Sequence, residues 1–307
     1  MRDLEGTRPG NARGGLTELH ADDYGLFPAQ SRRIFNCWEH GVLNAVSVMP
    51  NSPHLKDCMA FLPPNVRVAI HLNLMEGRSV RGDVPLLSDE TGRFHVSFGG
   101  LLLASYLPGR ARCRSQLKKE ISAQIHAVLP YLSGPLRIDG HAHYHMIPVV
   151  FDALMDVIEE EGLAVEYIRI PREHISLYLR HQRELSGVRP INLIKVLVLN
   201  CLAHRNLSKY KTFAQTLEQR VFLGVFLSGN MSYHNVSILL EDAKALAQAR
   251  GAGLEILAHP GGVREGEDIA QLTHPDDISF LTSGLREEEA EMFLKLRSEK
   301  EHERLDS

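Results

Sequence analysis

The sequence HADDYG, residues 20–25, places two adjacent carboxylates where an apolar approach meets a glycine. The preceding residues are typical of a short strand. Like charges repel, so placing the carboxylates of Asp22 and Asp23 side by side costs free energy unless a proton or a cation reduces their repulsion. At the end of a strand the backbone turns, and both side chains can reach one pocket. One carboxylate could then hold a metal ion while the other takes a proton from its water. The alternative is a turn or helix cap, a common use of Asp-rich segments that end in glycine.

The composition is that of an ordinary soluble globular protein. The chain has 307 residues, of which 44% are hydrophobic and 23% charged, and its formal net charge is −4. This charge gives no reason to expect nucleic acid or an anionic membrane as a partner. No apolar run reaches the roughly 18 residues of a membrane-spanning helix. Residues 1–15 lack the apolar core of a signal peptide and are expected to form a flexible leader. Four scattered cysteines without metal-ligand spacing favour a cytoplasmic enzyme with reduced thiols.

Strands and helices alternate through the first 75 residues. Apolar residues at helical spacing predict helices at 31–40 and 55–62, and β-branched or small apolar residues predict strands at 44–49 and 66–74. This alternation favours parallel strands joined by helical crossovers. The sequence therefore predicts the α/β class.

The rest of the chain continues the alternation less regularly. Further strands are expected at residues 136–140, 165–170, 222–227 and 254–258. Residues 76–108 hold five glycines and predict a long loop or lid beside the site. Residues 191–202 are apolar nearly all round, which predicts a buried helix. Residues 285–307 predict a charged helix with a solvated face.

Ionisable residues follow several of the expected strands: Asp22 and Asp23, then His71, His141 and His259. In parallel sheets and barrels, ligands bind at the carboxyl ends of the strands, where residues distant in sequence converge. One aspartate with two histidines leaves positions open for water and substrate, as a catalytic metal site requires. We expect one divalent ion, either Mg²⁺, Zn²⁺ or another transition metal. For His71 a core position, and for His259 a turn position, are the alternatives.

The segment DGHAHYH, residues 139–145, carries three alternating histidines. Not all three can reach one ion from a strand end, so His141, nearest the strand, is expected to be the ligand. His143 and His145 would then face the substrate or support the site. Asp139 could orient one imidazole, as carboxylates beside metal sites often do. Arg169 either faces the pocket and contacts substrate or pairs with a surface carboxylate.

Six segments together resemble a known family. They are ADDYGL (21–26), VSVMPNSP (46–53), AIHLNLMEGR (69–78), IDGHAHYHMIP (138–148), YIRIPRE (167–173) and LAHPGG (257–262). Their order resembles that of YdjC-like carbohydrate deacetylases, which include chitooligosaccharide and hopanoid-associated deacetylases. The resemblance implies a (β/α) barrel-like single domain with parallel strands, a distorted TIM-type barrel. It also implies a homodimer and the metal-dependent removal of acetyl groups from N-acetylated sugars.

Residue roles follow from the resemblance by position. Asp23, His71 and His141 would be the metal ligands. Asp22 would be the general base, and His259 the general acid.

The resemblance covers residues 16–286, which we take as the deacetylase domain, and leaves 287–307 as a charged C-terminal helix or tail. His20, and Thr17 with Glu18, depart from the usual apolar first strand. Residues 180–210 resemble neither named subgroup closely, so the substrate is specified only as a small N-acetylated carbohydrate. A metal-dependent sugar isomerase or epimerase, and a non-catalytic sugar-binding protein, are the alternative functions.

Overall fold

Seven parallel strands form one curled sheet in the computed structural model, in the order β5-β4-β3-β2-β1-β7-β6. The structure describes residues 16–264, 266–267 and 275–305. The strands are β1 Thr17–Tyr24, β2 Ala45–Val48, β3 Arg67–Leu72, β4 Leu136–Gly140, β5 Val165–Ile168, β6 Arg220–Leu223 and β7 Gly253–Ala258. The predicted α/β class with a single barrel-like parallel sheet is confirmed.

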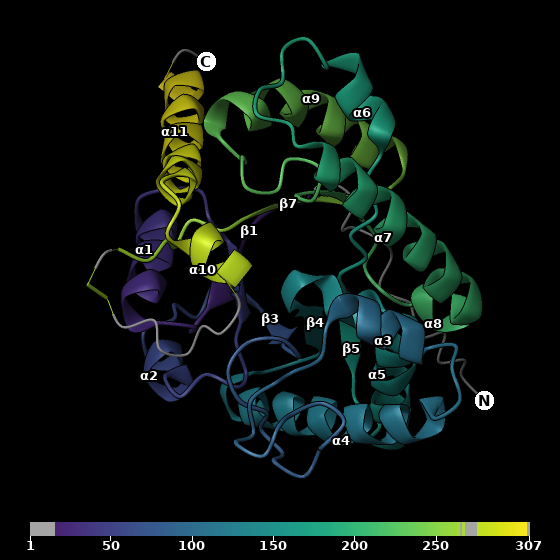
Figure 1. Ribbon diagram of the computed structural model, residues 1–307. Helices are drawn as coiled ribbons and strands as arrows, with labels where there is room; N and C mark the ends of the chain where they lie inside the picture. The colour runs from purple at the N-terminus through teal and green to yellow at the C-terminus, as the bar shows by residue number, and fades with distance from the viewer. Residues whose placement is uncertain (1–15, 265, 268–274, 306–307) are drawn as a thin grey trace, which may run out of the picture.

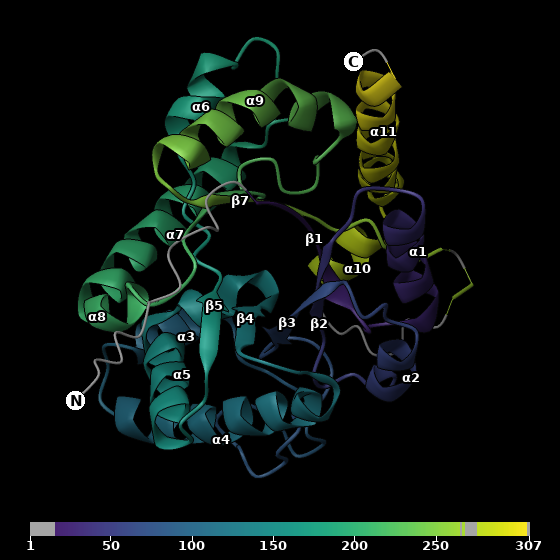
Figure 2. The same cartoon turned by 180° about the vertical axis from the view of Figure 1, so that it is seen from behind.

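Helices cover the outside of the curled sheet (Figures 1 and 2). They are α1 Pro28–Glu39, α2 Leu55–Ala60, α3 Phe98–Ala104, α4 Arg110–Val128, α5 Pro148–Glu160, α6 Ile175–Arg180, α7 Pro190–Lys209, α8 Lys211–Ala214, α9 Tyr233–Ala249, α10 Pro275–Leu281 and α11 Leu285–Leu305, with 3-10 turns η1 Leu129–Tyr131 and η2 His141–Met146. The strand expected at 222–227 begins two residues earlier and ends at Leu223, before the chain turns. No helix in the described part of the chain is both long and apolar enough to cross a bilayer.

The two faces of the sheet differ in polarity. Residues alternate between the faces of a strand. On β1 the residues Leu19 and Ala21 belong to the apolar core, whereas Glu18, His20 and Asp22 make polar contacts on the other face. The curled sheet therefore has a polar interior and an apolar exterior, and helices bury the exterior.

The segment predicted to be a long loop, 76–108, contains one helix. In α3 the Ser97 side chain accepts a hydrogen bond from the Gly100 N–H at the helix N-terminus, a favourable capping arrangement. The stretch before it is tied to α4, because the Glu120 carboxylate accepts bonds from the N–H groups of Val80 and Arg81 at 2.9 and 3.0 Å. Part of this segment is thus held against the barrel by a buried carboxylate.

The prediction of a buried helix at 191–202 is wrong. In α7 the side chains of Val196 and Leu199 are buried, but Ile191, Ile194 and Leu197 are each more than half exposed. The helix lies along the outer side of the molecule (Figure 1). An apolar run shows that a helix has apolar faces, but only the packing decides how many of those faces are covered.

The charged C-terminal helix packs on the domain through one face. Met292 and Phe293 of α11 are fully buried, and the Phe293 carbonyl accepts a hydrogen bond from Val42 N–H at 3.2 Å. The boundary between domain and tail at residue 286 stays a prediction. The predicted leader, 1–15, lies outside the described residues.

Candidate active site

Three side chains from different strand ends meet at the carboxyl edge of the sheet. Asp23 lies at the end of β1, His71 near the end of β3, and His141 directly after β4. Nδ1 of His141 lies 2.9 Å from Oδ1 of Asp23, and Nε2 of His71 lies 3.3 Å from the same oxygen. All three residues are buried, and their ligand atoms lie within 4.8 Å of one another. The predicted convergence of strand ends at this edge is therefore observed for these residues.

The backbone around this cluster is strained. Among the described residues, those other than glycine with positive φ are Asp23 (65°), Ala142 (47°) and His143 (58°). Such conformations cost of order 1–3 kcal/mol each and persist where the surrounding structure imposes them, often at functional sites. The positive φ of Asp23 redirects the backbone at the end of β1, and the carboxylates of Asp22 and Asp23 both lie within 4 Å of Nε2 of His71.

Asp22 is held by Arg169, which directly follows the edge strand β5 and reaches Asp22 across the interior of the curled sheet. Nη1 of Arg169 lies 3.0 and 2.9 Å from the two carboxylate oxygens of Asp22, and Nε of Arg169 donates to Glu255 at 2.7 Å. The Arg169 side chain is fully buried. Arg169 was expected either to contact substrate or to pair with a surface carboxylate. Its guanidinium pairs with buried carboxylates and orients Asp22, and a contact with substrate stays a prediction.

His71 is oriented by the carboxylate that the sequence suggested. Oδ1 of Asp139 lies 2.7 Å from Nδ1 of His71, so the other ring nitrogen, Nε2, faces Asp23. Burial opposes the charged imidazolium, but Asp22 and Asp139 outweigh it and raise the pKa of His71 to about 9. Burial likewise opposes the charge of Asp23, yet His141 and His71 hold the pKa of Asp23 well below its usual range. Asp23 is therefore ionised, and its charge faces imidazoles.

The other predicted histidines are placed differently. His145 is buried, and its Nε2–H donates to the carbonyl of Arg169 at 2.8 Å. This position agrees with the expected supporting role, and a contact with substrate stays a prediction. His143 is partly exposed, and no partner for its Nδ1 exists among the described residues. Burial lowers the pKa of His143 well below its usual range and that of His145 to about 4, so both rings are neutral near pH 7.

His259 directly follows β7, and the charges of Asp22 and Asp23 act on its ring. Its ring packs edge-on against Phe280 with centroids 5.0 Å apart. Burial lowers the pKa of His259, and the charges of Asp23 and Asp22 act in the opposite direction. The structure thus brings His259 close enough to the acidic pair for their charges to act on it.

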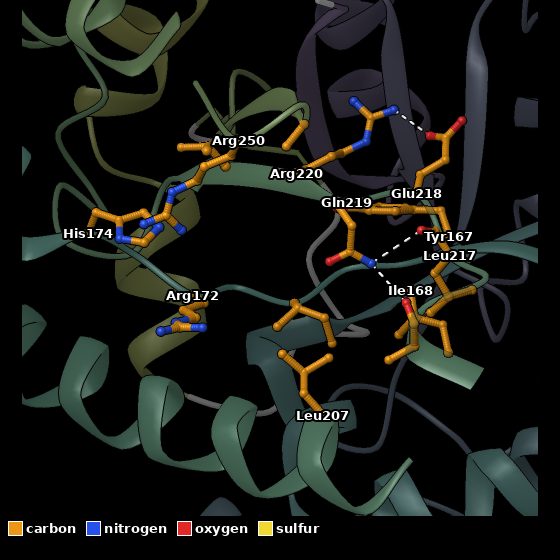
Figure 3. A pocket seen from close by; sticks show the side chains of 14 residues that line it. Tyr167, Ile168, Arg172, His174, Leu207, Leu217, Glu218, Gln219, Arg220 and Arg250 are labelled. Atoms are coloured by element: carbon orange, nitrogen blue, oxygen red, sulfur yellow. Dashed lines mark hydrogen bonds and ion pairs between the residues drawn. The ribbon is translucent and has the colours of Figure 1, made fainter. Parts of the chain in front are cut away.

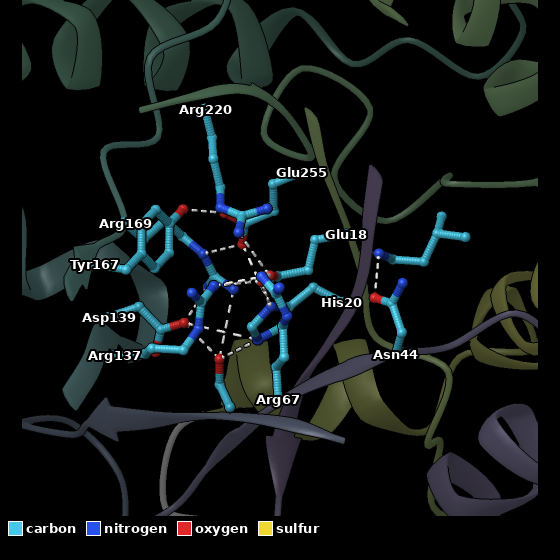
Figure 4. Close-up of polar contacts among 12 residues, drawn as sticks. Glu18, His20, Asn44, Arg67, Arg137, Asp139, Tyr167, Arg169, Arg220 and Glu255 are labelled. Carbon is cyan, nitrogen blue, oxygen red and sulfur yellow. Dashed lines mark hydrogen bonds and ion pairs between the residues drawn. The ribbon is translucent and has the colours of Figure 1, made fainter. Parts of the chain in front are cut away.

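Below the site lies a buried polar network that the sequence reasoning missed (Figure 4). Ser47 links the network through its hydroxyl, which lies 2.6 Å from Nε2 of His20 and donates to Asp139 at 2.5 Å. Nδ1 of His20 lies 3.0 Å from Glu18, and Arg137 Nη2 donates to both Glu18 oxygens at 2.9 and 2.8 Å. The signal was the period-two spacing of Glu18, His20 and Asp22, which interrupts an otherwise apolar strand.

Comparison with known proteins places the chain in a family. Residues 18–301 match the model of the family described as YdjC-like protein. A carbohydrate deacetylase of Danio rerio is 25% identical over 292 residues, covering 87% of this chain and 88% of that protein. A carbohydrate deacetylase of Geobacillus stearothermophilus is 28% identical over 158 residues, which are 51% of this chain and 61% of that protein. A chitooligosaccharide deacetylase of Yersinia pestis is 26% identical over 167 residues, covering 52% and 61%.

The fold has a counterpart among solved structures. A candidate cellobiose-phosphate cleavage protein of Enterococcus faecalis V583 superposes with a TM-score of 0.64 and 18% identity, covering 94% of this chain and 95% of that one. At this identity the likeness concerns the fold alone. The family match, in contrast, runs from β1 into α11 and includes the strand ends that carry the site. The chain therefore belongs to the YdjC-like protein family.

Proposed function

We propose that the protein is a metal-dependent hydrolase that removes the acetyl group from an N-acetylated sugar of the N-acetylglucosamine or chitooligosaccharide type. The cluster of Asp23, His71 and His141 is the observation that carries the proposal. Relatives named carbohydrate deacetylase and chitooligosaccharide deacetylase support the choice of reaction and substrate class.

The residues present fit a divalent cation. Among the described residues, Asp22 and Asp139 each pair with Arg169 and Glu18 pairs with Arg137, but Asp23 has only imidazole partners. A metal ion could serve as the counter-charge of this buried carboxylate if it displaces the proton that His71 otherwise carries. Two imidazoles in the donor set favour Zn²⁺ or another transition metal over Mg²⁺. When bound, such an ion would polarise the acetyl carbonyl and acidify water.

Asp22 is proposed as the general base. Its carboxylate lies beside the cluster, with Oδ2 3.8 Å from Nε2 of His71, and Arg169 fixes its orientation. A positioned base that accepts the proton of the attacking water typically contributes about 10²–10⁴-fold to the rate. The second carboxylate of the HADDYG sequence, Asp23, would serve as a ligand, so the adjacent aspartates have different roles.

His259 is proposed to deliver the proton that the departing sugar amine needs. Its protonated form depends on the negative charges of Asp22 and Asp23, because burial alone disfavours the imidazolium. His143 is partly exposed, and its buried Nδ1 has no hydrogen-bond partner in the described part of the chain. We propose that this ring contacts a sugar hydroxyl.

Two variants test these roles separately. Asp22→Asn should reduce acetate release from N-acetylglucosamine oligomers by at least about 10²-fold while the bound metal per chain stays unchanged. His71→Ala should lower both metal content and activity, because it removes a ligand. The measurements are metal analysis by mass spectrometry and an enzymatic acetate assay. Asp156→Asn and His204→Ala, outside the site, are the matched controls.

Full activity in Asp22→Asn would exclude Asp22 as the base. Unchanged metal content in His71→Ala would remove His71 from the ligand set. A metal-loaded wild-type protein that converts a sugar without releasing acetate would favour the isomerase or epimerase alternative.

A further inference from the structure

The barrel has an open seam between its edge strands β5 and β6, which do not pair with each other in the sheet. The seam is closed at its two ends. At one end Glu218 N–H donates to the carbonyl of Glu166 at 2.8 Å. At the other, the Glu173 carboxylate accepts bonds from Gly224 and Val225 N–H at 2.6 and 2.7 Å. Between these ties, a cavity of about 280 Å³ lies against the seam, lined by residues of β5, β6 and α7 (Figure 3).

One side of this seam cavity is positively charged. Arg172, His174 and Arg250 lie together there (Figure 3). None of these three side chains makes a hydrogen bond or an ion pair with any residue the structure describes. Burial lowers the pKa of His174, and the charges of Arg250 and Arg172 lower it further. Arg172 and Arg250 are therefore the cations of this end, without a counter-charge from the described part of the chain, and His174 is a neutral ring that can donate a hydrogen bond.

The acidic residue of the cavity does not neutralise them. Glu218 lies at the other end (Figure 3) and pairs with Arg137 at 3.0 Å and Arg220 at 2.7 Å. Arg220 also lines the cavity; its side chain is 4% exposed, and its Nε and Nη1 have no acceptor among the described residues. Because Arg220 also pairs with Glu18 at 3.0 Å, carboxylates compensate its charge, and it contributes only spare N–H donors at the Glu218 end of the cavity.

The remaining lining is largely apolar. Ile168 and Ile170 from β5 and its extension, Leu207 from α7, and Val221 from β6 contribute aliphatic side chains. Arg172 and Arg250 are exposed, so the charged end of the cavity opens to solvent, whereas Val221 and Ile168 are buried. An apolar cavity with a few convergent polar groups is the common form of a small-molecule site.

We propose that the seam cavity binds a small organic anion, with a phosphate or carboxylate head at Arg172, His174 and Arg250 and an apolar body against Ile168, Ile170 and Leu207. Guanidinium groups match both head groups through paired N–H donors. The site is distinct from the catalytic edge. Ile168 and Ile170 line the cavity, while the side chain of the intervening Arg169 is enclosed in the polar network with Asp22 and Glu255.

Isothermal titration calorimetry on the full chain, freed of metal with a chelator, tests this site without relying on deacetylase activity. Phenyl phosphate, benzoate, inorganic phosphate and neutral phenol are the probes. We expect one phenyl phosphate or benzoate per chain, weaker binding of inorganic phosphate and no binding of phenol. Comparing the affinities for phenyl phosphate and benzoate shows whether the site prefers a phosphate or a carboxylate head group.

Arg172→Gln combined with Arg250→Gln should weaken binding of the tighter probe by about 100-fold, or about tenfold for each charge-assisted contact removed. Arg183→Gln, an exposed arginine outside the cavity, is the matched control and should bind like the wild type. Circular dichroism confirms that each variant is folded.

Absence of binding by both organic anions up to about 10 mM would overturn the proposal. So would equal affinities for the folded double variant and the wild type, or an equal loss in Arg183→Gln, which would indicate non-specific attraction. Equal affinities for inorganic phosphate and phenyl phosphate would overturn the apolar half of the site.

Discussion

Asp139 contacts two residues on which the proposed reaction depends. Its Oδ1 lies 2.7 Å from His71 Nδ1, and its Oδ2 lies 2.9 Å from Nη1 of Arg169. The first contact fixes which nitrogen of His71 faces Asp23, and the second helps to place the arginine that holds Asp22. A single buried carboxylate thus positions both a proposed metal ligand and the proposed base.

We expect Asp139→Asn to weaken metal binding by about 10- to 100-fold, the usual effect of removing a charged partner from a metal-binding histidine. Titration of the chelator-treated protein with Zn²⁺ measures the affinity, and thermal melting confirms the fold. Asp156→Asn again serves as the control. A folded Asp139→Asn protein with wild-type affinity would show that the packing around His71, rather than this carboxylate, orients the ring.

At the scale of elements, Glu173 ties the segment that follows β5 to the turn after β6. Its carboxylate accepts three backbone N–H groups, those of Gly224 and Val225 at one oxygen and that of Phe226 at 2.8 Å at the other. These edge strands share no ladder, so this carboxylate substitutes for a missing strand pairing. Burial raises the pKa of Glu173 to about 7, although the three N–H donors act in the opposite direction.

This raised pKa gives a pH dependence of known sign. The pKa of Glu173 in the folded protein, about 7, lies above the ordinary value of 4.5. Between pH 4.5 and 7 the folded state therefore binds more protons at Glu173 than the unfolded state does. The stability that Glu173 contributes is complete below about pH 4.5 and is lost as the pH rises through 7. Between pH 5 and 8 we expect the free energy of unfolding of the wild type to fall by about 2–3 kcal/mol relative to Glu173→Gln.

Urea denaturation of both proteins at pH 5, 6.5 and 8 measures this difference. Glu159→Gln, an exposed position on α5, should show no such change with pH. A constant difference between wild type and Glu173→Gln across the range would mean that the three N–H groups keep Glu173 ionised throughout.

At the scale of the whole molecule, the barrel interior is a buried ionic network rather than an apolar core. Charged residues from β1, β4 and β7, and Arg169 directly after β5, contact one another there (Figure 4). Such networks tolerate poorly the loss of a partner, because an uncompensated buried charge costs several kcal/mol. The Asp23 cluster at the upper edge of this network is where a cation would add most to the stability of the fold.

We therefore expect the metal to stabilise the folded protein. At 100 times its dissociation constant, a ligand that binds only the native state adds about 2.7 kcal/mol, which corresponds to a rise of roughly 5 °C in Tm for a chain of this size. Differential scanning calorimetry with chelator and with added Zn²⁺ measures the shift. The shift should vanish in His71→Ala and persist in His204→Ala; a similar shift in both would place the stabilising ion elsewhere.

Much of this architecture was readable from local patterns. The alternation of strands and helices predicted the parallel sheet, and the position of Asp23, His71 and His141 at strand ends predicted their meeting. Both inferences depend on short-range regularities, the periods of strand and helix and the direction of parallel strands. The exposed face of α7 and the helix α3 were missed, because burial and local capping depend on neighbours that the sequence does not identify.

The sequence by itself determined which groups stand at the carboxyl ends of the strands, since strand periodicity and the order of the motifs fix that. Only the tertiary structure decided how their charges are paired. Arg169 reaches Asp22 across 147 positions of sequence, so that Asp23 keeps only imidazole partners among the residues that the structure describes. The open seam between β5 and β6 lies beside Arg172 and Arg250. Such pairings depend on how strongly the sheet curves and on which side chains of each strand face its interior. No local stretch of sequence specifies the curvature.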